Sequence, residues 1–450
     1  MHIPIPNKKN IKDNYKFVNS INSQYKYFYR LQIFYRLNID TQEEEVLINN
    51  CSFKTNIQIS PDDKFISYIN EINEINEINE INEINEFTIY DIDKKTNINN
   101  CILKHYCSSY VWANNYLIYY SDNKLNKIWL YDLRNCQNTL IFTEFNKDYN
   151  IICSLSSDKK YVIITSSNDN SNYSLYIDHN NNTNKIISIK KLNNGVKYYV
   201  EHYQGTFYLL TNEEAQNYKI VKFNSEINDW EPLIPHNNYV KINKFKLFSE
   251  FLVFTTTISE NKFINIYNFK NNTIIKTNNY VKELYNLSEY NNFMHHLQKI
   301  KYLYTIDFGI NNIFETNILN IKFKTYLTPT TLYDYNMNTN EKILVYKKDI
   351  FDYDETLYDT NIIFIPSIEN DNIIYLPLYI IYKKDKFIQD GTMQLYFCDL
   401  KYINFNPIIL TILNEGKICA ITPFDNFSKC TEYLIKNKYT NEGNILILKM

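Results

Sequence analysis

Serine, histidine and glycine could build a hydrolytic site in this 450-residue chain, but their order along it does not provide one. A serine nucleophile on an α/β sheet needs a Gly-x-Ser-x-Gly turn, followed along the chain by an acidic residue and a histidine. No histidine follows His296, and no two glycines are four positions apart. The six glycines are Gly195, Gly205, Gly309, Gly391, Gly416 and Gly443. A serine peptidase that lacks the whole triad loses a factor of about 10⁶ in catalytic rate. We therefore predict no catalytic residue here and expect that the chain, as written, does not hydrolyse peptides.

Cysteine and histidine could also hold a metal ion, but their spacing gives no ligand set. The chain has no Cys-x-x-Cys pair, and no histidine stands at ligand spacing from a cysteine. His295 and His296 end a short stretch of helical periodicity that begins near Val281, and neighbouring residues of a helix point about 100° apart. We predict surface or packing roles for these two histidines, reduced and buried thiols, and no metal or cofactor. The eight cysteines are Cys51, Cys101, Cys107, Cys136, Cys153, Cys398, Cys419 and Cys430.

Composition limits the classes of partner. The chain has 47 Lys+Arg against 50 Asp+Glu, and the lysines are scattered, so we expect no nucleic-acid partner. The N-terminus lacks the apolar segment of a secretory signal, and no stretch reaches the ~18 apolar residues of a membrane span. These features predict a soluble, cytoplasmic protein with no membrane partner. The 42 Tyr and 27 Phe favour a β-rich fold.

Short apolar runs, each ended by a cluster of Asn, Asp, Lys or Ser, predict an all-β fold from about residue 25 to 352. Pairs of such runs recur every 40 to 50 residues or so, which is the spacing of four-stranded propeller blades. We predict a β-propeller after an N-terminal tail at 1–24, with a β-sandwich as the alternative. Turn positions are expected for Asp132, Asn212 and Asp334. Packing between blades is expected for four aromatic residues, Tyr198, Tyr199, Phe207 and Tyr208.

One segment, 70–86, interrupts this pattern with a repeated Asn-Glu-Ile triplet. A period of three matches neither a strand nor a helix, so no single face collects the isoleucines. We expect a low-complexity loop between two blade strands.

Three segments follow one another along the chain: GVKYYVEHYQGTFYLLTNEEAQNYKIVKF (195–223), WEPLIPH (230–236) and FKLFSEFLVF (245–254). Together they resemble the propeller of oligopeptidase B, a member of the prolyl oligopeptidase family of serine peptidases. Segments at 43–48, 59–69, 110–133 and 326–349 occupy the places that the family would give them. The resemblance runs from about residue 25 to the C-terminus. It implies seven blades and a propeller that restricts access to short peptides.

Residues 353–450 resemble the first part of the family's α/β-hydrolase (peptidase) domain. A hairpin is expected from 361–366 and 373–382, a helix at 426–436 and a strand at 445–448. Segment 395–407, LYFCDLKYINFNP, falls where the family has a glycine-rich loop with the tyrosine that helps bind the oxyanion. Cys398 takes the place of that tyrosine, and a thiol is a weak, short donor. The nucleophile elbow is missing, because the family's serine would fall just past Met450.

Three interpretations follow. The preferred one is a catalytically inactive remnant, or pseudoenzyme, whose propeller binds short peptides or a protein partner. The second is a part of an active serine oligopeptidase that cleaves short peptides, with the Ser-Asp-His half missing from this chain. The third is an unrelated propeller scaffold. Because strand 445–448 would be an apolar edge, we also expect 353–450 to be loosely folded or covered by a partner.

Overall fold

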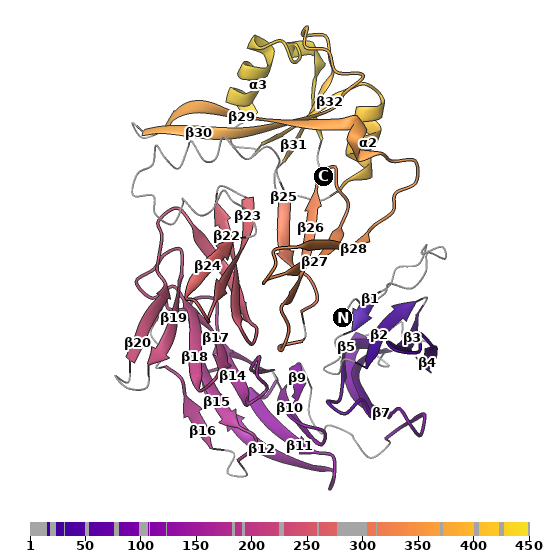
Figure 1. The fold of residues 1–450 in the computed structure, drawn as a ribbon, viewed down its shortest axis with the longest axis vertical. Coiled ribbons are helices and arrows are strands. Elements are labelled where there is room, and N and C mark those ends of the chain that lie inside the picture. The colour runs from indigo at the N-terminus through magenta and orange to yellow at the C-terminus, as the bar shows by residue number, and fades with distance from the viewer. Residues whose placement is uncertain are drawn as a thin grey trace. The chain divides into compact units, whose positions relative to one another are not determined.

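The fold is described by a computed structural model (Figure 1). The described residues are 16–18, 24–30, 32–49, 54–75, 81–98, 107, 109–122, 124–181, 185–190, 194–224, 229–258, 261–276, 304–311, 313–369, 372–399, 405–422 and 427–448. The chain divides into two compact units. Unit 1 comprises 1–238, 244–252 and 310–316, and unit 2 comprises 239–243, 253–309 and 317–450.

Seven four-stranded sheets follow one another along the chain, and in each the strands are hydrogen-bonded in chain order. The fold is therefore a seven-bladed β-propeller, as expected. Blades one to five contain β1 (Lys16–Val18), β2 (Tyr25–Arg30), β3 (Ile33–Asn38), β4 (Glu44–Ile48), β5 (Lys54–Ile59), β6 (Phe65–Ile75), β7 (Ile81–Asp91), β8 (Thr96–Asn97), β9 (Ser109–Trp112), β10 (Leu117–Asp122), β11 (Lys127–Asp132), β12 (Gln137–Thr143), β13 (Asn150–Leu155), β14 (Tyr161–Ser167), β15 (Asn172–Asp178), β16 (Ile186–Ser188), β17 (Tyr198–Tyr203), β18 (Thr206–Thr211), β19 (Lys219–Asn224) and β20 (Asp229–Ile234). Blades six and seven contain β21 (Lys241–Leu247), β22 (Phe251–Ile258), β23 (Asn261–Asn268), β24 (Thr273–Lys276), β25 (Tyr304–Phe308), β26 (Ile318–Thr325), β27 (Thr331–Asn336) and β28 (Lys342–Lys347).

An Asn or Asp at the end of the third strand shapes the turn into the fourth strand in five blades. Its side chain accepts a hydrogen bond from a backbone N–H two or three residues later. The residue four positions after it has a positive φ, which closes the tight hairpin. The pairs are Asn38 with Gln42 (φ 60°), Asp91 with Lys95 (55°), Asp132 with Cys136 (55°), Asn268 with Asn272 (53°) and Asn336 with Asn340 (62°). The expected turn role of Asp132 is confirmed.

Two other expected turn residues act differently. Asn212 binds a distant backbone segment: its Oδ1 accepts from the Lys197 N–H at 2.6 Å, and its Nδ2 donates to the Gly195 carbonyl at 3.0 Å. Asp334 lies inside β27 and accepts from Asn320 Nδ2 at 2.7 Å. The prediction for Asp334 was two residues out of place, because the strand runs on to Asn336 and only its last residue can cap the turn.

The aromatic residues of β17 and β18 pack as expected, with one exception. Tyr198 is buried, its hydroxyl donates to the Lys190 carbonyl at 3.0 Å, and Phe207 packs into the same cluster. Tyr208 is also buried. Tyr199 is 56% exposed, so its predicted place between blades is wrong. Successive residues of a strand point to opposite faces, which is why neighbours Tyr198 and Tyr199 differ.

Two boundaries differ from the expected ones. The triplet repeat expected as a loop at 70–86 is largely strand, since β6 continues to Ile75 and β7 begins at Ile81, with Ile72 opposite Ile84. Pairing between two strands satisfies the hydrogen-bonding groups of the backbone, and it does so whatever the period of the side chains. In the expected N-terminal tail, β1 pairs with β2 and belongs to the first blade. The histidines His295 and His296 lie outside the described residues.

A five-stranded mixed sheet follows the seventh blade. It consists of β29 (Tyr358–Glu369), β30 (Asn372–Lys383), β31 (Leu395–Asp399), β32 (Ile418–Thr422) and β33 (Ile445–Leu448), with helices α2 (Pro407–Asn414) and α3 (Phe427–Lys436) and short 3₁₀ turns η2 (Glu355–Leu357) and η4 (Glu442–Asn444). The order is β29-β30-β32-β31-β33. β30 pairs antiparallel with β29 and β32, and β31 pairs parallel with β32 and β33. The hairpin, the helix and the last strand expected from the sequence are present.

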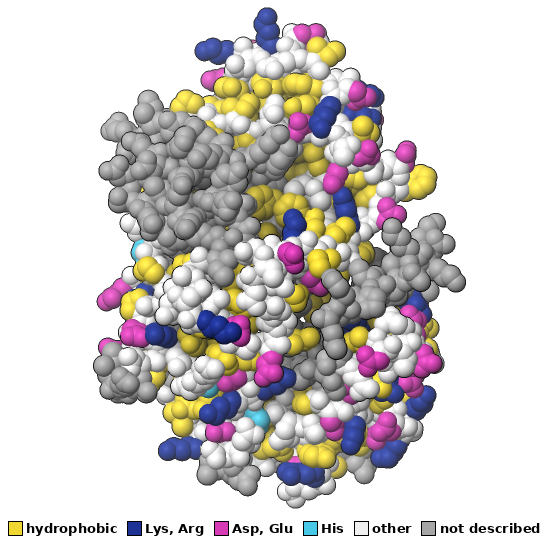
Figure 2. All heavy atoms as spheres, in the orientation of Figure 1, with side chains coloured by type: hydrophobic (Ala, Val, Ile, Leu, Met, Phe, Trp, Pro, Cys, Tyr) yellow, Lys and Arg dark blue, Asp and Glu magenta, His cyan; other side chains and the backbone are white. Residues whose placement is uncertain are grey.

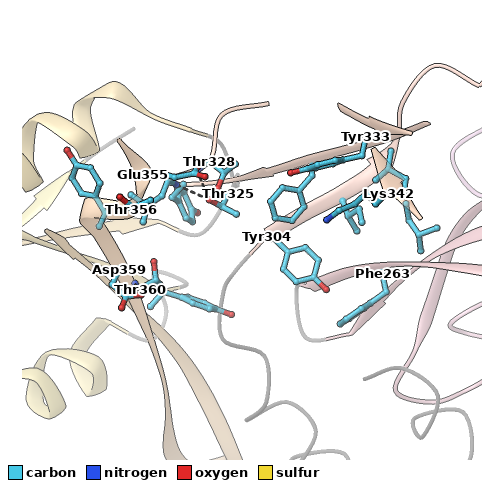
Figure 3. A pocket seen from close by; sticks show the side chains of 18 of the residues that line it. Phe263, Tyr304, Thr325, Thr328, Tyr333, Lys342, Glu355, Thr356, Asp359 and Thr360 are labelled. Atoms are coloured by element: carbon cyan, nitrogen blue, oxygen red, sulfur yellow. Dashed lines mark hydrogen bonds between the residues drawn. The ribbon is translucent and has the colours of Figure 1, made fainter. Parts of the chain in front are cut away.

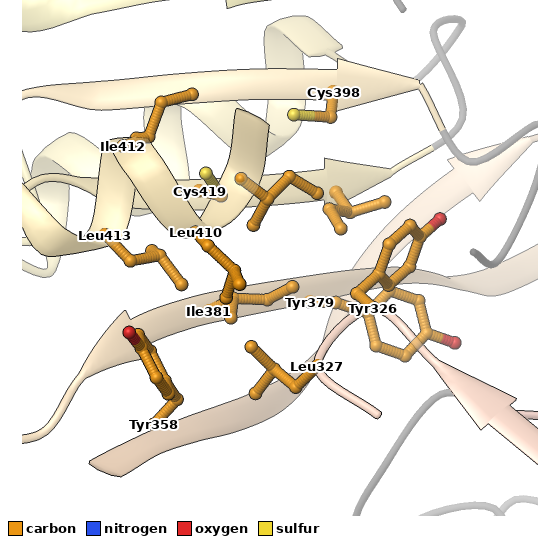
Figure 4. Close-up of a cluster of buried hydrophobic side chains, with 12 residues drawn as sticks. Tyr326, Leu327, Tyr358, Tyr379, Ile381, Cys398, Leu410, Ile412, Leu413 and Cys419 are labelled. Atoms are coloured by element: carbon orange, nitrogen blue, oxygen red, sulfur yellow. The ribbon is translucent and has the colours of Figure 1, made fainter. Parts of the chain in front are cut away.

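This sheet is covered on both faces, with α2 on one and α3 on the other (Figure 1). Alternate residues of each central strand enter different clusters: Cys398 and Cys419 pack with α2, whereas Phe397 and Ala420 pack with α3 (Figure 4). The loose packing expected of 353–450 is therefore not observed in the described residues of β30, β31 and β32. Helix α2 was not predicted, although Asn406 caps it by accepting from the Ile408 N–H at 2.9 Å.

The six described cysteines are free, and all except Cys136 are buried. Cys51 and Cys101 lie outside the described residues. On the face shown in Figure 2, acidic and basic side chains are interspersed, in line with their scattering along the sequence. Within the described residues, no helix is long and apolar enough to cross a membrane.

Candidate functional site

A buried carboxylate–imidazole pair lies in unit 1. His202 of β17 is 1% exposed, and its Nδ1 lies 2.8 Å from Oδ2 of Asp158, in the turn between β13 and β14. The rings of Tyr161 and Phe207 stand edge-on to the imidazole, with centroids 4.5 and 4.7 Å away. Burial opposes the charge of Asp158, but hydrogen bonds from His202 and Ser156 hold the pKa of this carboxyl below its usual value.

The serine beside this pair does not complete a triad. Ser157 donates its Oγ–H to Oε2 of Glu201 at 2.8 Å and its backbone N–H to the same oxygen at 2.9 Å. The Nε2 atom of His202 is buried and has no hydrogen-bond partner among the described residues. A general base must reach the proton that it removes, so this arrangement holds blades together and does not activate a nucleophile. Sequence reasoning missed the pair, which is 44 residues apart, about one blade repeat.

The carboxyl ends of the parallel strands form a second candidate site, because ligands of open α/β sheets bind there. Cys398, Ile421 and Leu448 stand level at this end of β31, β32 and β33. Cys398 is fully buried, and its side chain packs between α2 and the sheet (Figure 4). A hydrogen bond that the Cys419 S–H donates to Cys398, together with burial, raises the pKa of the Cys419 thiol well above its usual value. Both thiols are fully buried, so neither is accessible to a substrate. The residue at the expected oxyanion position offers no donor to a substrate.

A third candidate is a cavity of about 830 Å³ within unit 2, between the sixth and seventh blades and the β29–β30 hairpin (Figure 3). Its blade side is lined by apolar and aromatic residues, among them Phe263, Tyr304 and Tyr333. The hairpin side is polar and includes Glu355, Thr356 and Asp359. Ligand cavities of proteins commonly span 300–1,000 Å³ and combine apolar walls with a few polar groups, so this cavity is the size of a small-molecule or peptide site. No sequence motif marked it, since its residues come from distant strands.

No group of three or more His, Cys, Asp or Glu side chains suited to a metal ion occurs in the part of the chain that the structure describes. The candidate sites of the described residues are therefore the buried pair, the sheet end and the cavity.

Comparison with protein families gives a match over most of the chain. The model of the prolyl oligopeptidase N-terminal β-propeller domain matches residues 9–348. A search of curated protein sequences finds no match.

Solved structures show the same fold at low identity. Oligopeptidase B from Trypanosoma brucei, with covalently bound antipain, has a TM-score of 0.74 at 16% identity, and oligopeptidase B from Leishmania major has 0.73 at 16%. Each match covers 97% of this chain and 66% of the other. Prolyl oligopeptidase B from Galerina marginata has a TM-score of 0.71 at 15% identity, covering 96% and 69%. This chain thus spans about two thirds of the length of these proteins. Since the matches cover nearly all of it, the shared fold continues past residue 348.

Proposed function

This chain belongs to the prolyl oligopeptidase family, and from that premise we propose that it binds short peptides without hydrolysing them. The observation that carries the proposal is the place of Cys398, which the resemblance puts at the oxyanion-binding tyrosine. Its thiol lies in the core beside Cys419 and cannot donate to a developing oxyanion. Losing one such donor costs about 3–4 kcal/mol of barrier, and this chain also has no Gly-x-Ser-x-Gly turn. The interpretation as a propeller unrelated to this family is wrong.

The C-terminal sheet supports a hydrolase-type origin. Strands β31, β32 and β33 of this sheet are parallel to one another. Helices cover both faces of the sheet, as in α/β enzymes. We propose that 353–450 is the first part of a peptidase domain whose core has been kept while its catalytic groups are not supplied by these residues. Such a domain can still help to enclose a peptide. We also propose a cytoplasmic location, in line with reduced thiols in the described residues.

The first test is hydrolysis of short fluorogenic peptides ending in Arg or Lys by the purified 450-residue protein, with labelling by a fluorophosphonate serine probe beside it. An active oligopeptidase B serves as the positive control. We expect neither turnover nor labelling, together with measurable peptide binding by calorimetry. Turnover that persists through purification, with a labelled serine in this chain, would overturn the proposal.

A second function is favoured by one observation. Leu446 and Ile447 on β33 are 42% and 59% exposed, whereas their partners on β31, Tyr396 and Phe397, are half-buried and buried. An apolar edge of this kind suits pairing with a further strand. The alternative is therefore that this polypeptide is one part of an active serine oligopeptidase whose Ser-Asp-His half is supplied separately. Purification from the native source distinguishes the two: a co-purifying, fluorophosphonate-labelled polypeptide with peptidase activity would favour the second function.

A further inference from the structure

The cavity in unit 2 has an aromatic wall that is already ordered. The Tyr304 ring stands edge-on to Phe263 with centroids 6.0 Å apart, and it lies 5.8 Å from the Phe323 ring. Tyr335 is held by a hydrogen bond from its hydroxyl to Asn340 Oδ1 at 2.7 Å. Rings fixed in this way offer apolar surface without further loss of side-chain entropy. The wall suits an apolar or aromatic middle part of a ligand.

The hairpin side of the cavity carries carboxylate oxygens with unused capacity. Asp359 accepts the Thr360 N–H at 2.9 Å and has no ion pair among the described residues. Glu355 uses Oε1 for Lys347 at 2.8 Å, while its buried Oε2 has no hydrogen-bond partner in the described part of the chain. A carboxylate oxygen left without a donor away from water is costly, so a positively charged donor that enters here would be stabilised.

The blade side carries a positive charge; on the hairpin side the Lys384 ammonium also lines the cavity, but it donates to the Thr356 carbonyl at 2.8 Å. The Lys342 ammonium lies 4.5 Å from the centroid of the Tyr333 ring, and no carboxylate pairs with it within the described residues. The ring holds this ammonium in place while leaving its hydrogen-bond donors unused. Figure 3 shows Lys342 beside Tyr333 on the blade side and Asp359 on the hairpin side of the cavity. One cavity thus presents a free carboxylate and a free ammonium on opposite walls.

From this arrangement we propose that the cavity binds a short peptide by both of its free ends. Asp359 takes the N-terminal ammonium, with the open oxygen of Glu355 nearby, and Lys342 takes the C-terminal carboxylate. The aromatic wall packs against the side chains between them. In a single free amino acid the two charges sit on one carbon, so they cannot reach opposite walls; the ligand is therefore a zwitterionic peptide of several residues. The inference rests on the proposed peptide-binding function and assigns it a site away from the sheet end at Cys398.

The test measures binding of the tetrapeptide Ala-Phe-Ala-Phe to the 450-residue protein by isothermal titration calorimetry. Three forms are compared: free at both ends, N-acetylated, and C-amidated. Variants are Asp359→Asn and Lys342→Gln. Their matched controls are Asp229→Asn and Lys160→Gln. In the native chain Asp229 also accepts the N–H of the next residue (2.7 Å), and the Lys160 ammonium also lies over a tyrosine ring (5.2 Å). Thermal unfolding of each variant confirms that it is folded.

Each cap should weaken binding to the native chain by about tenfold, the loss of one charge-assisted hydrogen bond. Asp359→Asn should weaken binding of the free peptide by the same factor of about ten. N-acetylation of the peptide should then cause no further loss of affinity for this variant. Lys342→Gln should do the same for C-amidation, and the two controls should bind like the native chain. If each cap weakens binding as much in the variants as in the native chain, the site is elsewhere; the inference is then wrong while the peptide-binding proposal stands. No binding of any form would overturn both, and cleavage of the peptide, followed by mass spectrometry, would overturn the proposed function alone.

Discussion

Nδ1 of His202 contacts Oδ2 of Asp158 at 2.8 Å across the boundary between the fourth and fifth blades. Ser157 and Glu201, the residues next to them on the same two segments, make a second, partly buried link. The two links carry opposite pKa shifts, since the pKa of Asp158 is lowered and that of Glu201 is raised by burial. One blade junction therefore responds to pH in two directions, and each response can be measured.

The Asp158 link should lose strength in acid. Because its folded pKa lies below the unfolded value of about 3.9, the carboxylate stabilises the fold fully above that value, and the contribution is lost as pH falls through the folded pKa. Asp158→Asn should therefore lower the free energy of unfolding at pH 6 by roughly 1–3 kcal/mol, since it weakens a buried hydrogen bond. Denaturant unfolding between pH 6 and pH 3 gives the difference in free energy of unfolding between the variant and the native chain. This difference should become smaller below about pH 4. A difference that stays constant would contradict this.

Glu201 should behave in the opposite sense. Its folded pKa is raised above the unfolded value, chiefly by burial, so the protonated form favours folding at low pH and the benefit is lost as pH rises through the folded pKa. Glu201→Gln keeps an oxygen to accept from Ser157 and removes the buried charge. We expect this variant to be at least as stable as the native chain at pH 7, with a flatter stability profile above pH 5. Ser157→Ala serves as the control that removes the donor hydroxyl instead.

The turn caps of the blades should contribute measurably. Asn38 Oδ1 accepts from the N–H groups of Asp40 and Thr41 at 2.9 and 3.1 Å. Asn38→Ala leaves these donors to water and frees the turn, so we expect a loss of roughly 0.5–1.5 kcal/mol. Asp40→Ala, in the same exposed turn, is the control and should change stability by less than about 0.5 kcal/mol. Equal losses in thermal unfolding would show that the side-chain cap is unimportant.

The C-terminal sheet should be as rigid as the blades at its centre. Phe397 is buried in β31, and its ring centroid lies 4.6 Å from that of Phe427 on α3. Phe397→Ala should cost about 3–5 kcal/mol through the cavity that it leaves. Hydrogen exchange should show deep protection of β31 and β32 in the native chain and fast exchange in the variant. Ile408→Ala, at an exposed position of α2, should leave the exchange pattern unchanged.

The repeat pattern of the propeller was readable from the sequence because short apolar runs, each ended by polar residues, recur about once per blade, and in five blades an Asn or Asp ends the third strand before a turn with a left-handed residue. Cys136 shows the limit of this reading: it lies in a turn with φ 55° and is exposed, although its residue type suggested burial. Helix α2 was missed because it is only eight residues long, so the 3.6-residue period hardly repeats. The Asn-Pro start and Gly416 after its end were the available signals.

The candidate site was less predictable than the fold. The burial of Cys398 follows from the alternation of β31, in which Tyr396 and Cys398 face α2, and this period was present in the sequence. In contrast, Asp359 and Lys342 belong to different sheets, and nothing in their spacing indicates that they line one cavity. Juxtapositions of this kind depend on how whole elements pack, which local patterns do not encode.

The last strand should make the 450-residue protein associate. Within the described residues β33 has one hydrogen-bonded neighbour, β31. It exposes Leu446 and Ile447, and no charged residue lies between Ile445 and Leu448. Exposed apolar edges of this kind pair with other chains unless a charge blocks them. We expect light scattering to show mass rising with protein concentration, and Ile447→Lys to abolish the rise. Ile343→Lys is the control, because β28 is also an exposed outer strand but already carries Lys342 and Lys347. A native chain that stays monomeric at high concentration would contradict the prediction and show that this edge is protected in another way.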